Sequence, residues 1–256
     1  VRTHQKVLLN ALCKAAAYSL MKLALDPHYI GGKIGILSVV HTWTRAMIYH
    51  PHVHCLVPGG GLDGSRWIPA RKGFLVPVTA LSKIFRARFM ELAGEALPEV
   101  VFPDSVWEKD WVVYSKASVQ GTEKVLNYLA RYMHRVAITN SRILSIDDGR
   151  IRFRYKDSRE NAWKVMTLPA EEFIRRFLQH VLPRGFHKVR YYGILSHSNR
   201  HLLARAKALL SEAQTDLPCK QEPMSPPPSQ PLLCPSCKRG HLFCIGRVPP
   251  KERSPP

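Results

Sequence analysis

Residues 48–58 constrain the fold more than any other part of this 256-residue chain. They are rich in aromatic and β-branched residues and run into glycines at 59–61, which predicts a short strand followed by a turn. Because successive strand side chains point to opposite faces, His52 and His54 share one face, and His50 can extend the row. Two imidazoles side by side on a rigid strand can hold a divalent metal. Histidines near a turn are also compatible with an ordinary polar role, so the strand alone leaves both interpretations open.

The charge balance narrows the class of partner. Lys and Arg number 38 against 19 Asp and Glu, a formal net charge of +19, which predicts a polyanionic partner, and nucleic acid is the class we expect. Hydrophobic residues make up 45% of the chain, enough for a real core. An anionic membrane is the competing partner, but the sequence offers no apolar run that we expect to span a bilayer, and Lys22 interrupts the most apolar stretch. The six cysteines do not resemble a secreted disulfide set, and no signal-peptide pattern is visible, so we expect a cytoplasmic, nucleoid-associated protein.

Residues 122–135 form the second informative stretch, which predicts an amphipathic helix. Tyr128 and Tyr132 are four residues apart and therefore neighbours on the helix surface, beside Arg131 and Arg135. Two phenols next to a basic face are well placed to meet a phosphate backbone. The alternative is a pair of half-buried aromatic packing residues.

The remaining pattern predicts an α+β fold with a central antiparallel sheet flanked by helices. Asp148-Gly149 between two alternating runs indicates a β-hairpin, in which Arg152 and Arg154 share a basic face. That face is either a solvated surface or a track for phosphates. We expect further helices at residues 7–25, 80–93, 169–182 and 199–212, and further strands at 34–40, 66–68, 74–78, 111–114 and 163–167.

Composition divides the chain into four parts. Residues 1–212 carry the periodic segments of a catalytic domain, 213–232 form a Pro-rich linker, 233–246 a small Cys-rich module and 247–256 a disordered tail. In the module, Cys234 and Cys237 have the spacing of a zinc-knuckle half-site. His241 and Cys244 can complete four ligands for Zn²⁺, although the spacing is tighter than usual; another chain or segment can supply them instead.

A histidine pair, a tyrosine pair and a basic face together fit one chemistry. A metal polarises a scissile phosphate, and a tyrosine hydroxyl attacks it to leave a covalent phosphotyrosine. A free phenol, with a pKa of about 10, is a weak nucleophile, so the metal helps mainly by orienting the phosphate and neutralising charge. Two tyrosines permit two strand transfers without hydrolysis, since each can hold one DNA end.

These motifs resemble those of the two-tyrosine HUH transposases of rolling-circle insertion sequences, the insertion-sequence 91 group. The resemblance covers roughly residues 5–210 and is wider than the His52-Val53-His54 and Tyr128-x-x-x-Tyr132 motifs alone. It extends to His41-Thr42-Trp43, residues 50–61, 128–135, 153–156, 172–176 and 181–187.

The resemblance implies Mg²⁺- or Mn²⁺-dependent nicking and joining of single-stranded DNA through a 5′-phosphotyrosine. It makes His52 and His54 metal ligands and Tyr128 and Tyr132 nucleophiles, with the histidine pair on a central strand and the tyrosine helix beside it. A third polar ligand is expected, for which His50, His41 and Gln120 are candidates. Two departures stand out: residues 117–121 differ from the run expected before the tyrosine helix, and family members usually carry an N-terminal cysteine-rich zinc domain ahead of the point where this chain begins.

Two other functions compete with a transposase. A replication initiator or plasmid relaxase would use the same chemistry on a different DNA target. A non-catalytic nucleic-acid-binding protein would use the tyrosines as stacking platforms and the histidines as core polar residues. Replacing both tyrosines by phenylalanine separates the last alternative, because only an enzyme loses cleavage while keeping salt-dependent binding.

Overall fold

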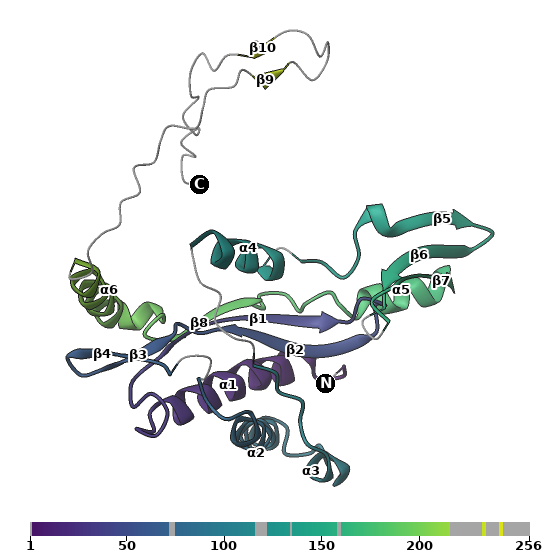
Figure 1. The fold of residues 1–256 in the computed structure, drawn as a ribbon. Coiled ribbons are helices and arrows are strands. Elements are labelled where there is room, and N and C mark those ends of the chain that lie inside the picture. The colour runs from purple at the N-terminus through teal and green to yellow at the C-terminus, as the bar shows by residue number, and fades with distance from the viewer. Residues whose placement is uncertain are drawn as a thin grey trace. The chain divides into compact units, whose positions relative to one another are not determined.

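The computed structural model describes residues 2–71, 75–115, 122–133, 135–157, 160–215, 232–233 and 241–242. The chain divides into two compact units, Val1–Glu212 and Ala213–Pro256. The first unit contains antiparallel sheets flanked by helices, which confirms the predicted α+β class (Figure 1).

A three-stranded antiparallel sheet lies at the centre of the first unit. It consists of β1 (Gly35–Trp43), β2 (Tyr49–Leu56) and β8 (Val189–Gly193) in the order β2-β1-β8. Strand β1 runs three residues past the predicted end, and this extension places His41 inside the sheet. Strand β8 was not predicted. Its five residues lack an apolar–polar alternation, and its pairing with β1 joins residues that are 150 or more positions apart.

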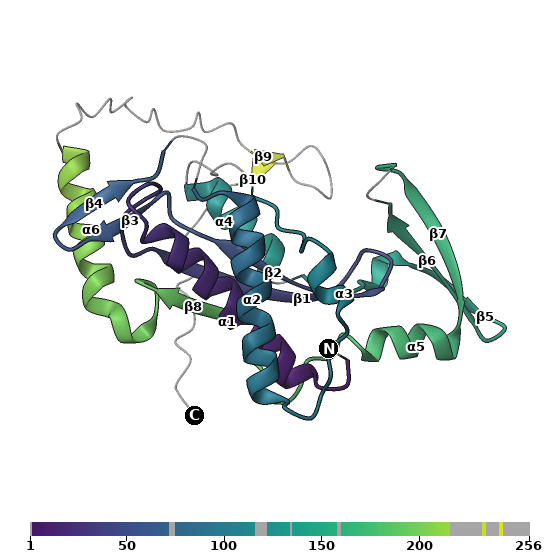
Figure 2. The same ribbon diagram turned by 90° about the horizontal axis from the view of Figure 1, so that it is seen from below.

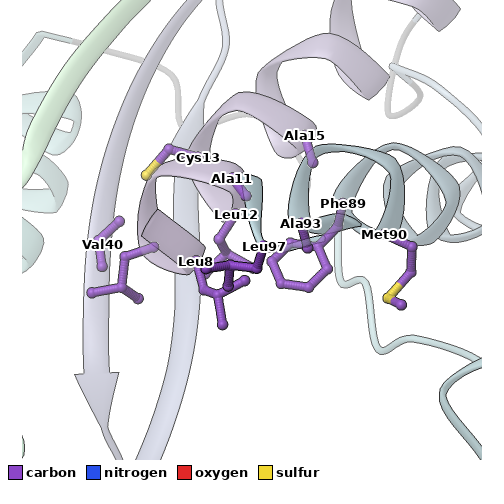
Figure 3. Close-up of a cluster of buried hydrophobic side chains, with 11 residues drawn as sticks. Leu8, Ala11, Leu12, Cys13, Ala15, Val40, Phe89, Met90, Ala93 and Leu97 are labelled. Atoms are coloured by element: carbon purple, nitrogen blue, oxygen red, sulfur yellow. The ribbon is translucent and has the colours of Figure 1, made fainter. Parts of the chain in front are cut away.

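Two antiparallel helices, α1 (Gln5–Ala24) and α2 (Val78–Ala96), cover one face of this sheet (Figures 1 and 2). Figure 3 shows their contact, where Leu8, Leu12, Phe89 and Ala93 pack together with Val40 of β1. Among the described residues, α1 is the one helix long and apolar enough to cross a membrane, so the prediction that no run reaches that length was wrong. Within its apolar window, however, 56% is buried inside the protein, as in a core helix.

A short hairpin extends the first unit beyond the central sheet. It pairs β3 (Gly60–Asp63) with β4 (Arg66–Pro69). Helix α6 (Arg200–Thr215) joins its core, where Leu62, Ile194 and Ala206 are buried together. The turn predicted at residues 59–61 is shorter than expected, because only Gly59 lies in a bend and Gly60 and Gly61 already pair as part of β3.

Two predicted strands were wrong. Of residues 74–78, the described ones form a bend that leads into α2, because Pro77 precedes the first helical residue and Val78 starts the helix. Residues 111–114 have no regular structure, and near them lies only the one-turn helix α3 (Ser105–Glu108). The apolar character of Trp111 is explained by packing on Phe85 and Phe89 of α2 rather than by strand pairing.

A second antiparallel sheet contains the predicted hairpin and third strand. It pairs β5 (Ile143–Asp147), β6 (Arg150–Lys156) and β7 (Trp163–Pro169) in sequential order, preceded by a 3₁₀ turn, Asn140–Arg142. Helix α5 (Ala170–Leu178) packs on one side and ends four residues before the predicted boundary. The buried cluster between them comprises Met47, Ile151, Phe153, Leu168 and Phe173.

Helix α4 (Thr122–Met133) lies on the face of the central sheet opposite α1 and α2 (Figure 1). It is the predicted tyrosine helix, ending two residues earlier than expected. In the second unit the two-residue strands β9 (Leu232–Leu233) and β10 (His241–Leu242) pair antiparallel. The predicted zinc ligands Cys234 and Cys237 lie outside the described residues.

Candidate metal centre

The pairing of β1 with β2 determines which side chains reach the face under α4. In this register Val39 lies opposite His54, Val40 opposite Val53, and His41 opposite His52. Opposed residues of an antiparallel pair point to the same face. Val40 and Val53 face the helical core, so the three histidines project from the other side of the sheet, toward α4.

Three imidazoles converge on this face. One ring nitrogen from each of His41, His52 and His54 lies within 4.8 Å of the other two. The His54 ring centroid is 4.7 Å from that of His41 and 4.8 Å from that of His52. His50, the remaining histidine of β2, is exposed and outside this group, with its ring 5.2 Å from His52. Gln120 lies outside the described residues.

Backbone hydrogen bonds determine which nitrogen keeps a lone pair on two of the rings. His52 Nδ1 lies 2.7 Å from the carbonyl oxygen of His50, and His41 Nε2 lies 2.9 Å from that of Tyr132. A carbonyl oxygen can only accept, so these nitrogens donate and the opposite nitrogen of each neutral ring is left unprotonated. A histidine that ligates a metal through one ring nitrogen usually donates the N–H of its other ring nitrogen to a carbonyl or carboxylate oxygen, which orients the ring.

Burial keeps all three rings neutral. It lowers the pKa of His41 to about 4 and that of His54 to about 3, and it also lowers the pKa of His52. The positive charge of Arg135 acts in the same direction on each ring, and Lys188 adds to it at His41. Neutral imidazoles at neutral pH are the form that binds a cation.

Helix α4 brings a tyrosine to the histidines. The Tyr132 ring centroid is 4.2 Å from that of His54 and 6.0 Å from that of His41. Tyr128 lies one turn earlier on the same helix; its side chain and that of Arg131 are outside the described part. Arg135 follows the helix, half-buried and close enough to influence all three rings.

Lys188 fastens the end of α4 to the sheet, a contact that sequence reasoning missed. Its Nζ donates to the carbonyl oxygens of Met133, at 3.3 Å, and Arg135, at 2.9 Å, and lies 5.3 Å from the centre of the Trp43 ring. Together with His41 it satisfies carbonyls at the C-terminal end of the helix, which would otherwise lack partners. No local pattern marks Lys188, since it acts only because β8 pairs with β1.

The other predicted DNA-contacting arginines lie elsewhere. Arg152 and Arg154 are exposed on β6, in the second sheet, and do not touch the histidines. The structure therefore presents two separate positively charged regions, one around α4 and one on β6.

Residues 35–201 match the family model Y2_Tnp, described as "Putative transposase". The chain belongs to this transposase family. It is 38% identical to the "Putative transposase y4qJ" of Sinorhizobium fredii (strain NBRC 101917 / NGR234), over 94% of this chain and 68% of that protein. It is 28% identical to the "Transposase for insertion sequence element IS801" of Pseudomonas savastanoi pv. phaseolicola, over 75% of this chain and 50% of that protein. The chain thus spans about two thirds of the length of one relative and half of the length of the other. No solved structure matches it.

Proposed function

We propose that this transposase cuts and rejoins single-stranded DNA, with a divalent metal held by His41, His52 and His54 and Tyr132 as a nucleophile. The observation that carries the proposal is the convergence of three neutral imidazoles beneath a tyrosine ring 4.2 Å from one of them. Similarity to proteins named as transposases supports an action on mobile-element ends rather than on a replication origin.

The donor set fits a divalent transition metal. Three nitrogen donors within 4.8 Å are close enough to share one ion after small side-chain adjustments. Imidazole nitrogen is a softer donor than the oxygen ligands that Mg²⁺ prefers, so we expect Mn²⁺ to bind better than Mg²⁺. When bound, the metal would orient the scissile phosphate and neutralise its developing charge.

The chain's own residues supply the nucleophile and the phosphate contacts. The Tyr132 oxygen loses its proton and bonds to phosphorus, the P–O3′ bond breaks, and the leaving 3′ oxygen takes up a proton. The product is a 5′-phosphotyrosine and a free 3′ hydroxyl. Tyr128, one helical turn away, would serve the second strand transfer of rolling-circle transposition. Arg131 and Arg135 would hold the adjoining phosphates.

The proposal is tested with a 3′-end-labelled single-stranded oligonucleotide carrying element-end sequence, incubated with the purified protein and Mn²⁺, because the fragment joined to tyrosine through its 5′ phosphate keeps the 3′ label. We expect a labelled band that migrates with denatured protein, disappears on protease treatment and requires the metal. Tyr128→Phe together with Tyr132→Phe removes the adduct, while DNA binding measured by anisotropy stays within about twofold. Tyr191→Phe, a change at an exposed tyrosine outside the candidate site, is the matched control and keeps the adduct.

Two outcomes oppose the proposal. If the doubly substituted protein still forms the covalent adduct, the tyrosine assignment is wrong. If wild-type protein binds the DNA but forms no adduct with any divalent metal, the chain is a nucleic-acid-binding protein without this chemistry.

A further inference from the structure

In the part of the chain that the structure describes, one face of the second sheet is exposed. Strand order and register place Arg150, Arg152 and Arg154 of β6 on the same side as Trp163, Val165 and Thr167 of β7, and all six are exposed. We call these six residues the basic sheet face. Arginines two residues apart along a strand are spaced by about 6.7 Å. Asp147 lies opposite Arg150 at the end of β5, so the strongest positive charge is around Arg152 and Arg154.

A rigid core supports this face from behind. Phe153, between the two arginines, is fully buried and packs edge-to-face on Phe173 of α5, with ring centroids 5.6 Å apart. Ile151 and Leu168 are buried in the same cluster. The basic sheet face is therefore a fixed surface, and a ligand that binds it does not have to order the strands first.

Trp163 adds an exposed aromatic ring to the basic sheet face. Its side chain is 61% exposed, and the Arg154 guanidinium carbon lies 5.4 Å from the ring centroid. An indole held beside a guanidinium presents a flat apolar surface next to a phosphate-binding group. Val165, opposite Arg154 in the register, is 53% exposed and extends the apolar surface.

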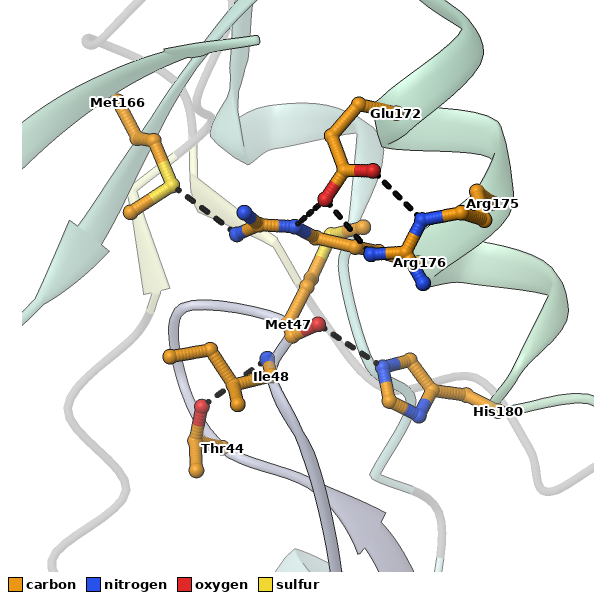
Figure 4. A network of polar contacts seen from close by, with 8 residues as sticks. All are labelled: Thr44, Met47, Ile48, Met166, Glu172, Arg175, Arg176 and His180. Carbon is orange, nitrogen blue, oxygen red and sulfur yellow. Dashed lines mark hydrogen bonds and ion pairs between the residues drawn. The ribbon is translucent and has the colours of Figure 1, made fainter. Parts of the chain in front are cut away.

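Arg142 and the β1–β2 turn fix this sheet relative to the histidines. The Arg142 guanidinium donates to the carbonyl oxygens of Arg154 on β6, Ala137 after α4 and Arg45 after β1. Figure 4 shows the second anchor, where His180, just beyond α5, bonds the Met47 carbonyl oxygen at 3.2 Å. Met47 itself is buried in the core of the second sheet.

We propose that the basic sheet face is a base-stacking site for unpaired DNA, with Trp163 as the platform and Arg152 and Arg154 as phosphate contacts. This proposal rests on the proposed function, because it assigns a binding site for the strand that the α4 tyrosines would cut. Unpaired DNA is favoured over duplex because an indole can stack only on a base whose face is accessible. The arginines supply charge complementarity, and the anchors through Arg142 and Met47 keep the bound strand at a constant distance from the metal centre.

The test compares affinities for a fluorescent oligothymidylate and for a duplex of the same length, by anisotropy in EDTA. Loss of one stacked base predicts that Trp163→Ala weakens single-strand binding by about 5- to 150-fold. The same substitution, Trp163→Ala, should change the affinity for the duplex by less than twofold. Trp107→Ala is the matched control, because Trp107 is also exposed, at 49%, and has Arg86 at 5.6 Å from its ring, but lies on α3. This control should change neither affinity by more than twofold.

The arginines give a second readout. Arg152→Gln with Arg154→Gln should reduce the slope of log affinity against log salt by about 1.4, since each lost contact to a single strand removes about 0.7. Trp163→Ala should leave that slope unchanged, and Trp163→Phe should recover part of the affinity. The proposal is overturned if Trp163→Ala binds the oligothymidylate within twofold of wild type, or weakens duplex binding equally.

Binding is measured without metal or cleavage, so this test is independent of the proposed function. The Trp163→Ala effect should appear equally in a Tyr132→Phe background. If no covalent adduct forms but Trp163→Ala weakens single-strand binding, the proposed chemistry is refuted and the stacking site is supported. If the adduct forms normally and Trp163→Ala has no effect on binding, the stacking site is refuted and the proposed chemistry is supported.

Discussion

His41 is 2% exposed and its pKa is lowered to about 4 by burial, so its neutral state contributes to stability. Between pH 6.5 and 4 the unfolded chain binds a proton at this residue that the folded chain does not. The free energy of unfolding therefore falls as the pH falls through this window. At about 1.36 kcal/mol per pH unit, the loss from His41 alone is about 2 kcal/mol at pH 5 and about 3 kcal/mol below pH 4.

The assay is urea unfolding followed by tryptophan fluorescence, in EDTA, at pH 8 and pH 5. Protonation of His52 and His54 also lowers the free energy of unfolding as the pH falls. The informative quantity is therefore the difference between wild type and the His41 variant in the free energy lost from pH 8 to pH 5. Between pH 8 and 5, wild type should lose about 2 kcal/mol more than His41→Gln, in which no imidazole is left to protonate at this position. His201→Gln, at an exposed histidine of α6, should keep the wild-type profile. Parallel pH profiles for wild type and His41→Gln would refute the reasoning.

Three further changes probe the site and its supports. Mn²⁺ at 100 times its dissociation constant should raise the melting temperature by about 5–10 °C, and His54→Ala should abolish the rise; an equal rise in the variant would contradict the ligand assignment. Phe153→Ala should lower the free energy of unfolding by about 3–5 kcal/mol in a urea titration, because it empties a fully buried site; a loss under 1 kcal/mol would mean that the second sheet does not depend on this core. Gly193→Ala should lower the free energy of unfolding by more than about 2 kcal/mol in the same assay, because its φ is +60° and a Cβ would collide with the Ile34 carbonyl. Gly149→Ala is the control, since its φ is +68° but a Cβ there would meet open space, so the loss should be smaller. Equal losses for the two variants would refute the steric argument.

The sequence alone determined the parts that depend on local periodicity. The alternation in residues 48–58 correctly places His52 and His54 on one face of β2, because a strand repeats every two residues whatever surrounds it. The Asp148-Gly149 turn and the tyrosine helix follow from equally local preferences, and both are present. Strong apolar runs without a period were less informative: residues 111–114 have no regular structure, and only Trp111 and Val113 pack against the core while Val112 and Tyr114 are exposed.

The tertiary structure decided everything that joins distant segments. By sequence, three residues are equal candidates for the third ligand, and the β1–β2 register brings His41 to the pair while leaving His50 outside. Lys188 reaches the end of α4 only because β8, an unpredicted strand, pairs with β1. Likewise, no spacing rule places Trp163 beside Arg154; nine residues separate them in the chain, and strand pairing sets them together. Side-chain period is a property of each segment, whereas register is set by burial and hydrogen bonding between segments, so only the folded chain shows which residues form the site.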